Sequence, residues 1–130
     1  MDDMNKKFND LTNTADHTSE MDANDVQANK VMAILSYLGF LVLIPIFGAK
    51  DSRFARFHAN QGLILWICGF VINIVFGLLG KIDLLATVFG LLRSLVSIII
   101  LILVVYGIVN AAGGKAKELP LIGGFKLLNY

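Results

Sequence analysis

The sequence has 130 residues, of which 56% are hydrophobic and 16% charged, and its mean hydropathy is +0.71. A soluble domain carries about 25% charged residues, so this composition excludes an ordinary soluble globule. Charge is uneven along the chain. Residues 1–30 hold seven acids and three lysines, a net −4, whereas residues 31–130 hold three acids and eight cations, a net +5. The sequence contains no basic stripe suited to nucleic acid, and its length allows one domain at most.

The acidic lead, residues 1–25, is predicted to be a disordered tail. It has few large apolar side chains and can bury too little surface to offset the entropy lost on ordering. The first apolar run begins only at Val31, behind a lead unlike that of a cleaved signal peptide. We expect residues 26–130 to form a helical membrane domain.

Three apolar runs predict an all-α integral membrane protein with transmembrane helices at about 29–47, 61–80 and 94–112. The uncharged stretches within them are 17 to 20 residues long, and about 20 residues of helix cross ~30 Å of hydrocarbon. Pro45 is expected near the end of the first helix, where a proline costs little.

The stretch between the second and third runs can be divided in two ways. A single helix from Asp83 to Ala112 would be about 45 Å long, half as long again as the hydrocarbon is thick. We favour an amphipathic or re-entrant helix over 81–93 followed by a third span from Ser94, because this division places Arg93 among the headgroups. If 81–93 crosses the membrane, the chain has four spans.

The cations beside the spans predict the orientation, because lysine and arginine are enriched in cytoplasmic loops. Three crossings place Lys30, Lys81 and Arg93 on one side. The other side receives six cations: Lys50, Arg53, Arg56, Lys115, Lys117 and Lys126. We therefore expect a multi-pass protein of the bacterial cytoplasmic membrane, with its N-terminus outside and its C-terminus in the cytoplasm.

The loop at residues 48–60 carries the most informative side chains. Its phenylalanines fall on one helical stripe with arginines beside them, so the rings can enter the membrane while the guanidinium groups bind phosphates. A second interpretation stays open: His58, Asn60 and Gln61 enter the mouth of the bundle and grip the backbone of a partner or substrate. The candidate interaction or lipid-anchoring residues are Lys50, Arg53, Phe54, Arg56, Phe57, His58, Asn60, Gln61, Lys115 and Lys117.

Helix packing is the second kind of predicted site. An amide near the middle of a span needs a partner on a neighbouring helix, and small residues four positions apart let helices approach closely. These criteria select Asn73, Ala86, Gly90, Ser94, Gly107 and Ala111.

Residue patterns for chemistry are lacking in the sequence. The two histidines, His17 and His58, have no companion ligands at metal-binding spacing. There is also no phosphate-binding glycine loop and no nucleophile elbow. We expect no enzymatic activity, no metal and no cofactor.

Three stretches carry a resemblance that extends over about residues 26–124. They are YLGFLVLIPIF (37–47), KDSRFARFHANQGLILWI (50–67) and AAGGKAKELPLIG (111–123). These stretches resemble the bacterial Tic-twenty-like proteins, small integral membrane proteins related to the channel-type subunit of the chloroplast inner-envelope import translocon. The resemblance implies a helical bundle in the cytoplasmic membrane.

The function that fits these features best is that of a non-enzymatic accessory or scaffold subunit. Such a protein would act through helix packing and its basic cytoplasmic loop, with membrane lipid and a protein partner or a second copy as its contacts. The resemblance suggests an alternative, an oligomeric pore or protein-translocation component. A third hypothesis is that the chain is an immunity or membrane-stress protein.

Overall fold

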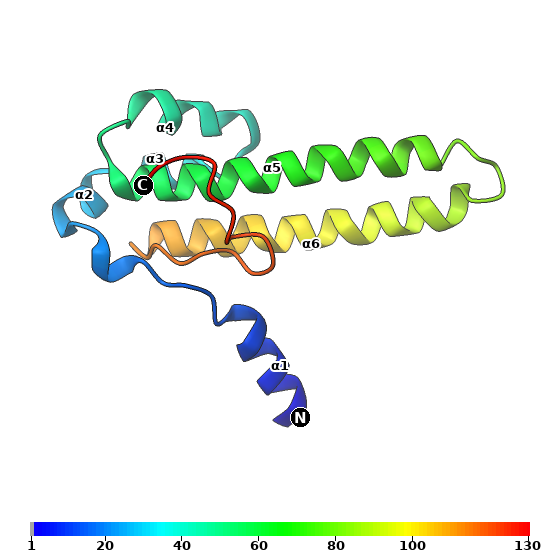
Figure 1. Ribbon diagram of the computed structural model, residues 1–130, viewed down its shortest axis with the longest axis horizontal. Coiled ribbons are helices and arrows are strands. Elements are labelled where there is room, and N and C mark those ends of the chain that lie inside the picture. Colours follow the sequence, from blue (N-terminus) through cyan, green and yellow to red (C-terminus); the bar gives the residue numbers. More distant parts are fainter. Residues whose placement is uncertain (1) are drawn as a thin grey trace.

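The computed structural model describes residues 2–130, and two long antiparallel helices dominate it (Figure 1). These are α5 (Arg53–Leu79) and α6 (Ala86–Ala112), joined by a loop at 80–85 that lies far from both chain ends. Shorter elements precede them: α1 (Asp2–Thr12), η1 (Thr18–Glu20), α2 (Ala23–Ala28), α3 (Lys30–Leu35), η2 (Gly39–Val42) and α4 (Leu43–Gly48). Within residues 2–130 all the regular secondary structure is helical. This part of the chain has no strand and one isolated β-bridge.

Helices α5 and α6 are each long and apolar enough to cross a membrane. Each has 27 residues, or about 40 Å of helix, close to the thickness of a bilayer with its headgroups. Only 22% of the most apolar stretch of α5 and 6% of that of α6 is buried inside the chain. Apolar surface left uncovered on this scale needs a lipid or protein environment. The predicted all-helical class is confirmed, with two such helices in place of three.

The predicted first span at 29–47 is wrong, because this run folds back on itself. Helix α3 ends at Leu35, the chain turns through Gly39 with φ +67°, and η2 and α4 return along α5. A left-handed φ is easily adopted only by glycine. Pro45 occupies the first turn of α4, where its missing N–H breaks no helical hydrogen bond. The proline expected at the end of one helix therefore helps to start another.

The predicted division of the last apolar run is also wrong. Residues 81–85 lie in the loop, and α6 continues without a break from Ala86 through Ser94 to Ala112. Arg93 is therefore inside one long helix rather than at the junction between two, and the structure is close to the single-helix alternative. Its Nε donates a hydrogen bond to Oδ1 of Asn73 on α5, at 2.7 Å, so a polar partner accompanies the charge.

Segments near the two ends of the chain, residues 15–17 and 116–118, pair beside the start of α5. His17 N donates to the carbonyl of Ala116 at 2.8 Å, and Glu118 N donates to the carbonyl of Ala15 at 3.0 Å. The expected orientation would separate these segments across a membrane, whereas the structure pairs them. Helix α1, in the predicted tail, lies apart from the other helices in Figure 1.

The molecule divides into two regions along α5 and α6. The head comprises residues 14–62 and 107–130, and the stem comprises residues 63–106. Helix α3 packs on both long helices, and α4 packs on α5. Most large buried side chains belong to the head, among them Tyr37, Phe54, Phe57, His58 and Leu119.

Candidate interaction site in the head

The start of α5 is fixed by two side chains. Ser52 Oγ accepts a hydrogen bond from Ala55 N at 3.0 Å, and Asp25 Oδ2 on α2 accepts one from Phe54 N at 3.0 Å. Both acceptors satisfy N–H groups of the first turn, which have no partner within the helix. Most of the predicted loop at 48–60 is therefore the beginning of α5.

His58 is fully buried at the centre of the head. Its Nε2 lies 2.8 Å from the carbonyl of Lys115, and its Nδ1 lies 2.6 Å from the hydroxyl of Tyr37. Because a carbonyl only accepts, Nε2 donates, and Nδ1 then accepts from the tyrosine. The rings of Phe54 and Phe57 pack against the imidazole with centroids at 4.8 and 5.1 Å. This histidine joins α5 to the turn after α3 and to the segment that follows α6.

Two buried amides hold the C-terminal segment, residues 115–130, against α5. Asn60 Nδ2 donates to the carbonyl of Phe125 at 2.9 Å, and its Oδ1 accepts from the amides of Leu127 and Leu128. Gln61 Nε2 donates to the carbonyl of Gly123 at 3.0 Å. Its Oε1 accepts from Leu119 N at 2.9 Å. The backbone that these side chains grip belongs to the chain itself.

Two glycines allow the closest contacts in the head. A Cβ at Gly62 would lie 1.8 Å from the carbonyl oxygen of Ser36, so α3 and α5 can meet only at a glycine. A Cβ at Gly107 would lie 2.2 Å from the ring of Tyr37. Ala111 is buried one turn further along α6. Gly107 and Ala111, both predicted packing residues, therefore lie against the head.

The predicted cations lie around this buried cluster. Some of them contact other parts of the head, and others are exposed. Arg53 donates to the carbonyl of Glu20 at 3.2 Å, and Arg56 Nε donates to the carbonyl of Asn129 at 2.5 Å. Lys117 is half-buried, and its backbone forms the isolated β-bridge with Asp16. Lys50 and Lys115 are exposed. The two arginines thus help to hold the head together, whereas the two exposed lysines are available to groups outside the chain.

The remaining predicted packing residues lie in the stem. Asn73 accepts the bond from Arg93 and donates to the carbonyl of Gly69 in its own helix, at 3.0 Å. Ala86, Gly90 and Ser94 are exposed, and a Cβ at Gly90 would meet no atom within 4 Å. The ridge is thus exposed along its length, and Ser94 Oγ donates to the carbonyl of Gly90 within it, at 3.1 Å.

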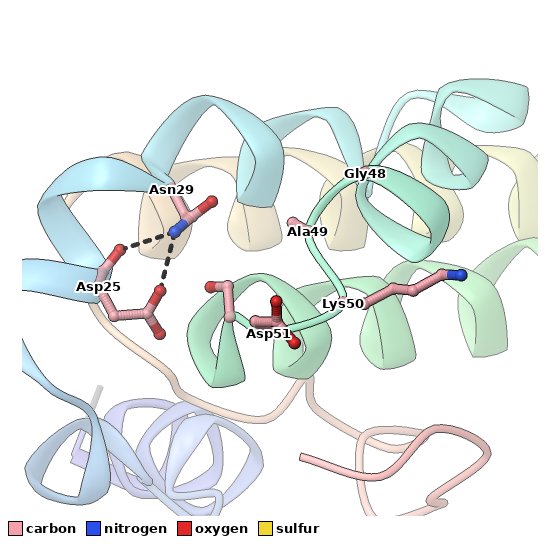
Figure 2. Close-up of a pocket in the computed structure, with 7 residues that line it drawn as sticks. Asp25, Asn29, Gly48, Ala49, Lys50 and Asp51 are labelled. Atoms are coloured by element: carbon pink, nitrogen blue, oxygen red, sulfur yellow. Dashed lines mark hydrogen bonds between the residues drawn. The ribbon is translucent and has the colours of Figure 1, made fainter.

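A polar cavity of about 270 Å³ opens where α2 and α3 meet the turn before α5 (Figure 2). Asn29 Nδ2 donates to Oδ1 of Asp25 at 2.8 Å on one wall, and Lys50 extends away from that pair. Asp25 also binds the start of α5, so both of its carboxylate oxygens already have partners. Over the residues that the structure describes, no three His, Cys, Asp or Glu side chains gather as metal ligands would.

The roles of several residues in the head could not be predicted from the sequence. Tyr37 and Ser36 look like parts of a membrane span, and Asp25 looks like part of an acidic tail. These residues contact segments far away in the sequence, so the local periodicity of apolar residues does not predict their contacts. The glycine that directly follows Gln61 was the available signal, because a small residue beside buried amides indicates close backbone approach.

The fold and this cluster define a small α-helical protein with two helices able to span a membrane and a tightly bonded head. Residues 28–127 match the family model of the magnetosome magnetite crystal formation protein family. The chain belongs to this MamF/MmsF family.

Relatives from two organisms support the assignment. The chain is 35% identical over 100 residues to magnetosome protein MamF of Paramagnetospirillum magneticum, covering 75% of this chain and 82% of that protein. It is 35% identical over 96 residues to MmsF of the same organism, covering 71% and 79%. MamF of Magnetospirillum gryphiswaldense is 35% identical over 92 residues, covering 71% and 77%. No solved structure matches the chain.

The family assignment corrects the resemblance drawn from the sequence. The three stretches attributed to Tic-twenty-like proteins lie within the matched residues 28–127, and their assignment to that family was wrong. The import-channel reading rested on that resemblance and has no support once it is removed.

Proposed function

We propose that this chain is a non-enzymatic accessory or scaffold protein of the magnetosome membrane. In this proposal the stem is embedded in lipid and the head presents a rigid surface on one side. The observation that carries the proposal is the contrast between the apolar, mostly unburied surface of α5 and α6 and the buried, hydrogen-bonded cluster around His58. The relatives' names, magnetosome proteins, supply the membrane concerned.

We further propose that both chain ends lie on the cytoplasmic side. The hydrogen bonds between residues 15–17 and 116–118 support placing the ends together. A hairpin with two crossings also puts seven cations on the head side: Lys30, Lys50, Arg53, Arg56, Lys115, Lys117 and Lys126. The loop at 80–85 carries one cation, Lys81, and Arg93 lies about two turns into α6 on the same side. This distribution favours a cytoplasmic head more strongly than the three-span count favoured its own orientation.

The contacts outside the chain follow from the same arrangement. The exposed Lys50 and Lys115 are suited to anionic lipid phosphates, each cation contributing about 1 kcal/mol near such a surface. The ridge of Ala86, Gly90 and Ser94 remains our prediction for contact with a protein partner or a second copy.

Reporter fusions at Asn24, Asp83 and Tyr130 test the proposed topology. The expected result is a cytoplasmic signal from both ends and the opposite signal from the loop. A different compartment for each end would refute the two-span arrangement. Recovery of the chain with purified magnetosome membranes after an alkaline wash tests the location, and loss of the chain in the wash would refute it.

A further inference from the structure

We propose that the hairpin formed by α3, η2 and α4, residues 30–48, is a wedge that inserts into the head-side leaflet alone. The wedge would make the protein favour membranes that are convex on the side of the head. This inference rests on the proposed crossing of α5 and α6, and its partner is the acyl region of one lipid leaflet.

The depth of the hairpin supports insertion into one leaflet. About 20 residues of helix cross the hydrocarbon; counted back from Gly80 along α5, this length ends at Gln61. The turn of the hairpin lies beside Trp66, because a Cβ at Gly39 would be 3.9 Å from the indole. The turn is therefore about five residues, or ~8 Å, inside the hydrocarbon edge. That depth is within one leaflet, because half of the ~30 Å hydrocarbon is about 15 Å.

The outer surface of the hairpin is apolar and lies next to the apolar surface of α5. Phe40 at the turn is 92% exposed, and Val31 and Phe47 are also mostly exposed. A lysine stands at or just beyond each end of the hairpin: Lys30 begins α3, and Lys50 follows α4. Apolar residues between flanking cations are typical of a segment that lies in the membrane interface with its charges at the phosphates.

The C-terminal segment adds apolar surface at the same end of the molecule. Leu121 and Phe125 are exposed, and the segment is tied to Asn60 and Gln61 at the hydrocarbon edge. At the opposite end of the stem, the protein consists only of the ends of α5 and α6 and the loop that joins them. The embedded part of the protein is therefore wider in the head-side leaflet, and shallow one-sided insertion of this kind is sensitive to curvature.

The first test is orientation in vesicles of two sizes. The full chain is reconstituted into small sonicated and large extruded vesicles of the same phosphatidylcholine and phosphatidylglycerol mixture. External protease then measures the share of molecules with an exposed C-terminal tag. We expect this head-out share to rise in the small vesicles, where the outer leaflet is strongly convex. An equal share in both sizes would overturn the proposal, because the cationic head alone biases both sizes alike.

Matched variants separate the wedge from general hydrophobicity. Phe40→Ser removes an exposed side chain at the turn and should abolish the dependence on vesicle size. Leu84→Ser removes an equally exposed side chain, 89% exposed, from the opposite loop and should preserve it. Equal effects of the two substitutions would contradict the wedge.

The second test is depth. A fluorophore on a cysteine at position 40, in a Cys68→Ala background, should be quenched more by nitroxides high on the acyl chain than by deep ones. Absence of quenching at either depth would mean that protein or water covers the turn, and would overturn the proposal. A protease site at Asp83 that stays protected in head-out vesicles reports the crossing separately, so the wedge can fail while the membrane hairpin stands.

Discussion

The head and the stem use the same two helices in different ways. In the head, buried Asn60, Gln61 and His58 each bond to backbone from distant parts of the chain. In the stem, the polar contact between the helices is the bond from Arg93 to Asn73, and the outer surfaces are apolar. The head is thus held together by its own hydrogen bonds and packing, whereas the stem depends on its surroundings. Changes in the head should therefore unfold the protein, and comparable changes in the stem should be tolerated.

A series of glycine substitutions gives the largest expected contrast. Gly62→Ala puts a methyl group 1.8 Å from the backbone oxygen of Ser36, which cannot move without displacing α3. We expect a loss of about 3 kcal/mol in unfolding free energy, at the upper end for overpacking. Gly90→Ala enters open space and should stabilise α6 by about 0.5–1 kcal/mol. Unfolding in mixed detergent micelles, followed by circular dichroism, measures both; equal effects would remove the distinction between head and stem.

The amides offer a second, smaller contrast. Gln61→Leu leaves the amide of Leu119 and the carbonyl of Gly123 buried without partners, at a cost of about 2 kcal/mol. We expect the C-terminal segment to detach and become sensitive to limited proteolysis after Lys126. Asn73→Leu removes an amide of the stem and should leave that cleavage slow. Rapid cleavage in both variants would show that the segment is not held by Gln61.

Arg93 tests how much of the stem lies in hydrocarbon. It is seven residues from the start of α6, about two turns, so Arg93→Leu should favour membrane insertion of residues 86–112 by about 1 kcal/mol. This is less than the ~2.5 kcal/mol expected at a helix centre. A glycosylation reporter for insertion measures the shift, and Arg93→Lys, which keeps the charge, should produce little of it. An unchanged efficiency for the leucine variant would place Arg93 at the headgroups.

The smallest expected effect is a pH dependence where the chain ends meet. The hydroxyl and backbone N–H of Thr18 donate to the Asp16 carboxylate, and together with nearby Lys117 they lower its pKa. A lowered pKa in the folded state means that this contribution is present above the ordinary value, about pH 4, and is lost as the pH falls below it. The protection of the His17 amide, its hydrogen-exchange rate relative to that of an unstructured amide at the same pH, should therefore decrease below about pH 4. Asp16→Asn should remove that decrease, and a variant that keeps it would exclude Asp16 as the cause.

The sequence predicts the features of this molecule that depend on composition and local pattern. The helical class, the charge-free run from Gln61 to Gly80 and the end of the last helix at Ala112 can be read from neighbouring residues. The fold-back at Gly39 cannot, because an apolar helical hairpin and an apolar span have the same composition. The sequence predicts Arg93 among the headgroups, at the end of a helix over 81–93, because its polar partner, Asn73, lies 20 positions away.

The candidate site shows the same limit more sharply. Sequence patterning singled out His58, Asn60 and Gln61 as side chains that could grip a backbone. The identity of that backbone depends on contacts 57 to 68 residues away. Tyr37 and Asp25 receive their roles only from tertiary contacts, so sequence reasoning assigned them to a span and a tail.

The meeting of the two chain ends also constrains the order of folding. Thr18 Oγ1 accepts from the amide of Ala116, 98 positions later, so this contact cannot form until nearly the whole chain has left the ribosome. A free chain would close so long a loop slowly. Once α5 and α6 have paired, their ends already lie together and only short segments remain to be closed. Insertion of the stem should therefore precede closure of the head. The lipid bilayer would then act as a template, because it holds α5 and α6 together while the last third of the sequence pairs with the first third.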